Sequence, residues 1–239
     1  HALAAVGATT FLVSLVINLF MGVSIGANAV IANYIGRQDR QGVRRAVSTT
    51  VALSLMSGVL LMVIGLLVAT PLLRLLGTPD DVISDSALYL HIYFLSSPFF
   101  MVYNFGAAIF RSKGDTRTPL YILAVAGVIN IVVSMVTVIV FQMSVAGVAC
   151  ATLVSNVFSS VVVVVLLRRE EGDFRVRLSK VRIYRKELFN ILGIGLPAGL
   201  QAMVFSFSNI FVQSSINKFG YAAIAGASLC ITFDTYCYY

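Results

Sequence analysis

Seven runs of apolar residues divide this chain, and each is long enough, or nearly long enough, to cross a lipid bilayer. The runs cover residues 5–34, 47–73, 86–110, 119–141, 145–167, 188–216 and a shorter 222–239. Crossing about 30 Å of hydrocarbon takes roughly 20 apolar residues. Each run must be helical, because lipid offers no partner for a free backbone amide. The pattern therefore predicts an all-α integral membrane protein, a polytopic helical bundle.

The composition agrees with a membrane protein and restricts the partners. Hydrophobic residues make up 59% of the chain and charged residues 11%, whereas a soluble domain carries about 25% charged residues. The net charge of +7 lies in short loops beside apolar runs, where phospholipid headgroups are the expected partner. We therefore expect membrane lipids, and no nucleic acid, as partners.

The basic residues alternate between two sets of loops. The loop after the first run, the loop after the third run and the stretch 168–187 together hold 15 of the 17 Lys and Arg residues, and the other loops hold only Arg74 and Lys218. Loops rich in Lys and Arg face the cytoplasm. The alternation predicts that the first helix runs inward from the outer side, and that 168–187 is a cytoplasmic linker.

Five stretches resemble segments of the multidrug and toxic compound extrusion (MATE) antiporters. They are Ala27–Val47, similar to the inner end of helix two and its following loop; Phe110–Leu120, similar to the loop between helices four and five; Val128–Val132 in helix five; Val145–Asn156 at the entry to helix six; and Gly195–Gln201 in helix seven. They occur in the order and with the spacing of that family.

The resemblance implies a fragment of a twelve-helix, pseudo-symmetric transporter made of two six-helix bundles. Residues 1–167 would form helices two to six of the first bundle, and 188–239 would form helix seven and part of helix eight. The similarity of Ala2–Thr9 to Ala222–Ser228 fits repeated halves. On this alignment the family's helix one, which carries an Asp of the cation site, precedes the chain.

The strongest single candidate for binding a cation is Asp234. It is the only one of the ten acidic residues inside an apolar run, about 12 residues past Ala222 and hence about 18 Å into the membrane. A carboxylate at that depth costs about 2.5–3.5 kcal/mol on insertion scales, so such residues usually face a cavity. A purely structural role for Asp234 stays open.

Run 188–216 carries a second group of candidates, Pro197, Gln201, Ser208 and Asn209. The first three fall within about 40° of one another on a helix that turns about 100° per residue. Proline removes a backbone hydrogen bond, and the carbonyl it frees can meet water or a ligand in a cavity. Tyr103 and Asn104 are further cavity-lining candidates. Packing between helices is the alternative for both groups, and anchoring at the membrane interface is a further alternative for Tyr103 and Asn104.

The resemblance and these residues lead to one functional hypothesis. We expect a monomeric secondary active antiporter in a bacterial or archaeal inner membrane that exports small cationic amphipathic drugs or toxins in exchange for Na⁺ or H⁺. We expect no cofactor, structural metal or catalytic residue, because the one acidic cluster, Asp80, Asp81 and Asp85, lacks the second cluster that a metal-dependent prenyltransferase needs. A flippase for lipid-linked oligosaccharides is the alternative, although its cavity would be expected to hold basic residues, and all 17 here lie in loops.

Overall fold

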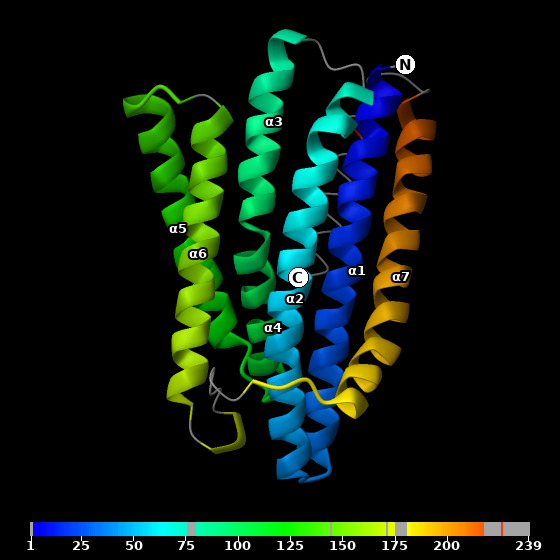
Figure 1. Ribbon diagram of the computed structural model, residues 1–239, viewed down its shortest axis with the longest axis vertical. Helices are drawn as coiled ribbons and strands as arrows, with labels where there is room; N and C mark the ends of the chain where they lie inside the picture. The colour runs from blue at the N-terminus through cyan, green and yellow to red at the C-terminus, as the bar shows by residue number, and fades with distance from the viewer. Residues whose placement is uncertain are drawn as a thin grey trace.

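The described secondary structure of the computed structural model is entirely helical (Figure 1). The structure describes residues 2–75, 80–143, 145–170, 172–174, 181–217 and 226, in parts of which only the backbone is placed. The helices are α1 (Ala2–Gly36), α2 (Arg40–Leu75), α3 (Asp80–Leu95), α4 (Ser97–Ser112), α5 (Arg117–Met135), the π-helical turn η1 (Val136–Val140), α6 (Val145–Arg169), the short η2 (Gly172–Phe174) and α7 (Arg185–Asn217).

Six of the seven apolar runs correspond to membrane-spanning helices. Five helices within the described ranges are long and apolar enough to cross a membrane, and α3 with α4 forms a sixth span that is bent by 40°. The bend lies at Ser96, just before Pro98, which cannot donate a hydrogen bond to the preceding turn. The position of Pro98 therefore accounts for the break inside this span. Apart from residue 226, the seventh run lies outside the described residues, as do the turn at 77–79 and Asp234.

The interior of the bundle formed by α1 to α6 joins apolar side chains from several helices. Ile31 of α1, Phe105 of α4 and Val163 of α6 are fully buried, and small residues let the backbones between them approach. Gly58 lies against Pro98, so that a Cβ at Gly58 would stand 2.5 Å from the Pro98 Cα. Packing of this kind replaces the hydrophobic effect as the main association force between helices in lipid.

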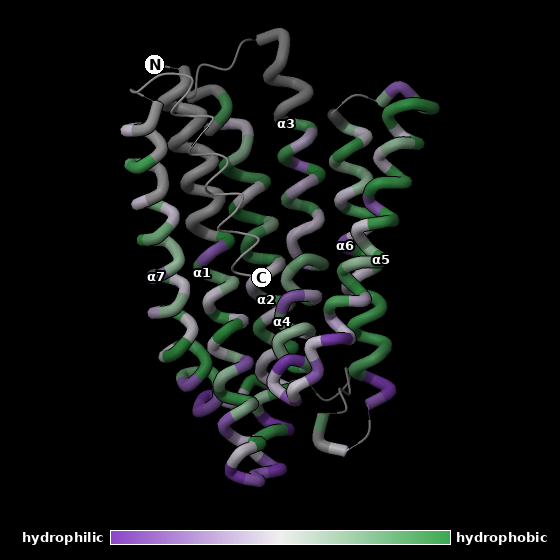
Figure 2. The backbone as a smooth tube through the Cα atoms, turned by 180° about the vertical axis from the view of Figure 1, so that it is seen from behind, coloured by the Kyte–Doolittle hydropathy of each residue, from purple (hydrophilic) through white to green (hydrophobic). Residues whose placement is uncertain are grey.

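Much of the outer surface is apolar, as a lipid-facing surface requires. The exposed face of α5 and η1 carries large hydrophobic side chains, among them Leu120, Val128 and Ile139, and only 11% of the span that these two elements form is buried. Figure 2 shows the hydrophilic backbone segments gathered at the end of the bundle where α1 meets α2 and the linker runs. We call this the basic end.

In two loops at the basic end, an Asp carboxylate accepts a hydrogen bond from the backbone N–H three residues later. Asp39 Oδ1 accepts the Gly42 N–H (2.9 Å), and Asp115 Oδ1 accepts the Thr118 N–H (3.0 Å). Each carboxylate satisfies a donor that the first turn of a helix leaves free. The pattern Thr118-Pro119 predicts a helix capped by the Thr118 hydroxyl, and this is wrong. α5 begins at Arg117, and the capping group is the Asp115 carboxylate.

Candidate functional site

Three of the four predicted site residues on α7 lie along the face that no described helix covers. Pro197, Gln201 and Ser208 are all exposed, whereas the side chain of Asn209 lies outside the described residues. α7 continues through Pro197 from Arg185 to Asn217. The structure thus keeps the predicted stripe together on one face, and it does not bring this stripe near the described polar groups of the other helices.

The opposite face of α7 packs against α1 through four glycines. A Cβ at Gly26 would stand 2.6 Å from the Gly195 amide nitrogen, and one at Gly199 would stand 2.8 Å from the Leu19 carbonyl oxygen. Gly22 meets Gly199 in the same way. Close helix packing is the expected use of the four-residue spacing Gly22 to Gly26. Sequence reasoning missed the same spacing at Gly195 and Gly199, which supplies the other side of this α1–α7 seam.

A hydrogen bond joins the two helices farther along the seam. The Asn18 amide donates to the Ser206 hydroxyl (3.0 Å), which in turn donates to the Ala202 carbonyl within α7 (3.0 Å). Neither Asn18 nor Ser206 is among the predicted site residues. A signal was present, because Ser206 lies seven and eleven residues after Gly199 and Gly195, the spacing of one helix face.

The two candidates on α4 take part in helix packing inside the bundle. The Tyr103 hydroxyl donates to the Pro119 carbonyl (3.0 Å), which joins α4 to the start of α5. The Asn104 side-chain amide donates to the Phe100 carbonyl (2.8 Å), and the Asn104 backbone carbonyl accepts a hydrogen bond from the Ser24 hydroxyl of α1 (3.1 Å). Asn104 is buried. These contacts engage the Tyr103 hydroxyl and the Asn104 side-chain NH2 group within the bundle, and a cavity-lining role stays a prediction.

Two further polar contacts cross between helices and involve residues that sequence reasoning did not select as site residues. The Asn130 amide of α5 donates to the Ser155 hydroxyl of α6 (3.3 Å). The Asn156 amide of α6 donates to the Ser96 hydroxyl at the bend between α3 and α4 (3.2 Å). Both pairs are neutral, and each satisfies polar groups that would otherwise be unpaired in an apolar setting.

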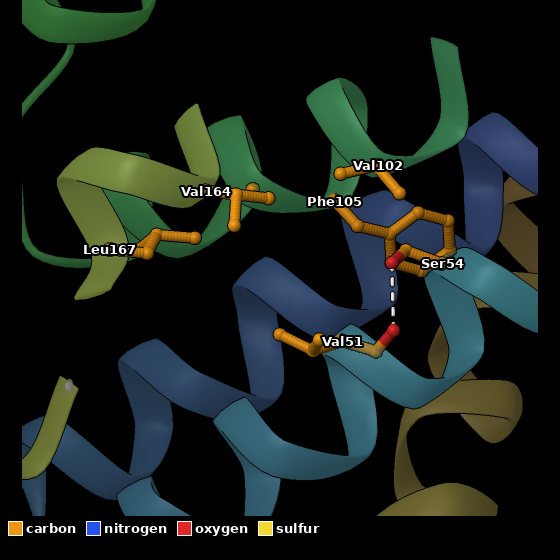
Figure 3. A pocket seen from close by; sticks show the side chains of 7 residues that line it. Val51, Ser54, Val102, Phe105, Val164 and Leu167 are labelled. Carbon is orange, nitrogen blue, oxygen red and sulfur yellow. Dashed lines mark hydrogen bonds between the residues drawn. The ribbon is translucent and has the colours of Figure 1, made fainter. Parts of the chain in front are cut away.

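A small cavity lies between α2, α4 and α6 (Figure 3). Its lining is apolar except for one side chain and consists of Val51, Ser54, Val102, Phe105, Gly106, Val164 and Leu167. The Ser54 hydroxyl is turned to its own helix, where it donates to the Val51 carbonyl (2.8 Å). No charged group lines this space, so it offers nothing to hold a cation. Within the ranges that the structure covers, no three His, Cys, Asp or Glu side chains gather as a metal site would require.

Comparisons with known proteins place the chain in a transporter family. The sequence model of the family MatE matches residues 1–136. The "Probable multidrug resistance protein YoeA" of Bacillus subtilis is 32% identical over 231 residues, which are 94% of this chain and 50% of that protein. The "Multidrug export protein MepA" of Staphylococcus saprophyticus is 24% identical over 225 residues, with the same coverage of 94% and 50%.

The fold agrees with solved structures of such transporters. A crystal structure of MATE in the bent conformation superposes with a TM-score of 0.82 at 26% identity, covering 94% of this chain and 50% of that one. The chain spans about half the length of the curated relatives it matches. The all-helical, membrane-spanning fold expected from the resemblance is thereby confirmed, and with more than half of its residues matched by the family, the chain belongs to MatE.

Proposed function

We propose that the chain is part of a secondary active antiporter that exports cationic amphipathic drugs or toxins in exchange for Na⁺ or H⁺. The observation that carries the proposal is the match to MatE over residues 1–136 together with relatives named for multidrug resistance and export. These names support a multidrug efflux transporter. We propose in addition that the substrate is cationic and that the coupling ion is Na⁺ or H⁺.

The arrangement of charge supports a cationic substrate over an anionic one. Arg37, Arg44, Arg111 and Arg168 are exposed at the helix ends and loops of the basic end, and the described helix interiors carry neutral polar groups such as Asn104, Asn130 and Asn156. A path for a diphosphate-linked sugar would need basic side chains inside it. A cationic substrate needs neutral acceptors and a carboxylate, which Asp234 would supply.

The basic end would face the cytoplasm, since basic loops stay on that side. We therefore place the protein in the inner membrane of a bacterium or archaeon as a multi-pass monomer, with membrane lipids as its surroundings. It needs no cofactor beyond the coupling ion, because a gradient of Na⁺ or H⁺ supplies the free energy for export.

The test is ethidium efflux by the full-length protein, driven by an imposed Na⁺ or H⁺ gradient, in wild type and in Asp234→Asn at matched membrane expression. Asn is nearly isosteric with Asp and cheaper to bury than a carboxylate, so the variant is expected to fold and to lose most of its efflux. Wild-type efflux by Asp234→Asn would remove Asp234 from the site. No gradient-driven efflux by the wild type, with a defect in envelope polymer assembly when the gene is deleted, would favour the flippase instead.

A further inference from the structure

One serine of α2 holds both backbone groups of a linker residue. The Ser48 hydroxyl donates to the Arg182 carbonyl (3.0 Å) and accepts the Arg182 N–H (2.8 Å). The next residue along α2 adds a third contact, because the Thr49 hydroxyl accepts the Tyr184 N–H (3.2 Å) while donating to the Arg45 carbonyl (2.8 Å). The end of the linker is therefore attached to α2 by three hydrogen bonds, although 181–184 has no regular structure.

Two cationic side chains reinforce the position of the linker. The Arg45 guanidinium lies 5.7 Å from the centre of the Tyr184 ring, within the range of a cation–π contact. At the start of the linker, Lys113 Nζ lies 2.7 Å from Glu170 Oε1 and 5.3 Å from the centre of the Phe174 ring. Both ends of the linker are thus held by the bundle of α1 to α6, through α2 and the loop between α4 and α5.

α7 starts at Arg185, directly after this attachment, and packs mainly along α1 (Figure 1). One face of its first turns is buried at the basic end, where Glu187 is 2% and Ile191 0% exposed. The inner end of α7 therefore has two supports, the attachment at Ser48 and Thr49 and the glycine seam with α1. The Ser48 bonds are open to solvent, so water can replace them and the attachment is reversible.

We infer that Ser48 and Thr49 are positioning residues that keep the inner end of α7 closed against α1. The linker must leave the two hydroxyls before α7 can move away from α1 at the basic end. The attachment favours the closed arrangement over the open one, and it shifts this equilibrium by the free energy that its contacts contribute. The part of this inference that concerns export rests on the proposed function, whereas the part that concerns the seam does not.

The test is the labelling rate of a single cysteine at Ile191→Cys, in an otherwise cysteine-free full-length protein, by a soluble maleimide added to open membranes. We expect Thr49→Val to raise the rate about five-fold, the ratio that corresponds to the net contribution of one hydrogen bond. Ser48→Ala removes two hydrogen bonds to the linker and should raise the rate at least as much. Ser48→Thr, which keeps the hydroxyl, should restore the slow rate. Ser57→Ala is the matched control, because the Ser57 hydroxyl is also on α2 but donates to Ser54 of its own helix.

Equal labelling rates in wild type, Ser48→Ala and Thr49→Val would overturn the inference, and so would an equal rise in Ser57→Ala. If Ser48→Ala does not accumulate in the membrane, Ser48→Thr and Thr49→Val carry the comparison.

Export gives a second readout. A positioning role changes kcat for ethidium efflux and leaves KM unchanged, whereas a merely structural role lowers the amount of folded protein and leaves both constants unchanged. Labelling needs no substrate, so a wild type without efflux overturns the proposed function and leaves the labelling result intact.

Discussion

Gly26 of α1 faces Gly195 of α7 so closely that a methyl group on Gly26 would stand 2.6 Å from the Gly195 amide nitrogen. That distance is shorter than any ordinary carbon–nitrogen contact, so neither position has room for a side chain unless the helices separate. Backbone contact of this kind maximises dispersion and Cα–H···O contacts, which drive helix association where lipid removes the hydrophobic effect. The seam is thus specified by residue size.

We predict that Gly195→Ala destabilises the full-length protein. Its Cβ would stand 2.6 Å from the Val23 Cα, and overpacking of this kind costs about 1–3 kcal/mol. The apparent Tm in detergent should fall by several degrees.

Gly193→Ala is the matched control, because it lies on the same helix, is exposed, and has nothing within 4 Å of its added Cβ. Ala is up to about 1 kcal/mol better than Gly in a helix, so Gly193→Ala should keep or raise the Tm. A Gly195→Ala variant as stable as Gly193→Ala would show that the seam is not formed in the whole protein.

The stabilisation from Asp115 is predicted to depend on pH. Hydrogen bonds to Thr118, first with its side chain and then with its backbone, hold the pKa of the Asp115 carboxyl below its usual value of 3.8. A lowered pKa means that folding favours the charged form, so the stabilisation is complete above that usual value and is lost as the pH falls through the lower folded value.

Asp115→Asn removes the titration and keeps a capping oxygen. We expect the free energy of unfolding of wild type to exceed that of Asp115→Asn by roughly a few tenths of a kcal/mol at neutral pH, because the carboxylate is partly exposed and is screened by solvent. Tm measured from pH 7 to pH 3 should show the difference closing only below about pH 4, and it should shrink in high salt. A difference that is unchanged at pH 3 would mean that the carboxylate charge plays no part.

Features of this fold that depend on residues close together in the chain could be predicted from the sequence, whereas contacts between residues far apart in the chain could not. Apolar length predicts the spans, and charge asymmetry predicts that the loops bearing Arg40, Lys113 and Arg182 share one end, as they do. The position of the bend before Pro98 also follows from local chemistry. These features need only the residues beside them.

The pairing of helices could not be predicted in the same way. The hydroxyls of Ser48 and Thr49 resemble those of many serines in membrane helices until the linker lies beside them, 134 residues later in the chain. Gln201 and Ser206 are both polar residues of α7. Ser206 meets α1 because it lies on the same helix face as Gly195 and Gly199, which pack against α1. Periodicity gives the faces of a helix, whereas the partner of each face depends on tertiary packing.

Lys113 and Glu170 are predicted to contribute to the position of the linker as a pair. Their side chains are 19% and 28% exposed and 2.7 Å apart, so the coupling energy should be about 0.5–1 kcal/mol, the upper range for partly exposed pairs. A double-mutant cycle of Lys113→Met and Glu170→Gln, with stability measured by Tm, gives this number. The charge-reversed pair Lys113→Glu with Glu170→Lys should recover part of it, and a coupling energy of zero would contradict the contact.

Tyr103→Phe is predicted to change stability and not substrate affinity. The change removes the hydrogen bond to the Pro119 carbonyl, which contributes about 0.5–1.5 kcal/mol net, while the ring keeps its packing. Tm should fall by a few degrees, and the KM for ethidium should stay at the wild-type value. A raised KM with an unchanged Tm would instead place Tyr103 in the substrate path and favour its cavity-lining role.

The last prediction concerns the two faces of α7. Gln201 and Ser208 lie on the face that no described helix covers, whereas Ser206 is turned to α1 by its hydrogen bond with Asn18. If the uncovered face lines a water-filled path, Gln201→Cys and Ser208→Cys should react with a soluble thiol reagent at least about ten-fold faster than Ser206→Cys. The reason is that the thiolate is the nucleophile that attacks the reagent, and it forms in water and not in lipid. Ethidium should slow the reaction at residue 201 if the substrate passes there. Burial of this face against lipid or the rest of the transporter would leave all three positions equally slow. In that case the polar stripe serves packing between helices, and Gln201 and Ser208 leave the list of candidate binding residues.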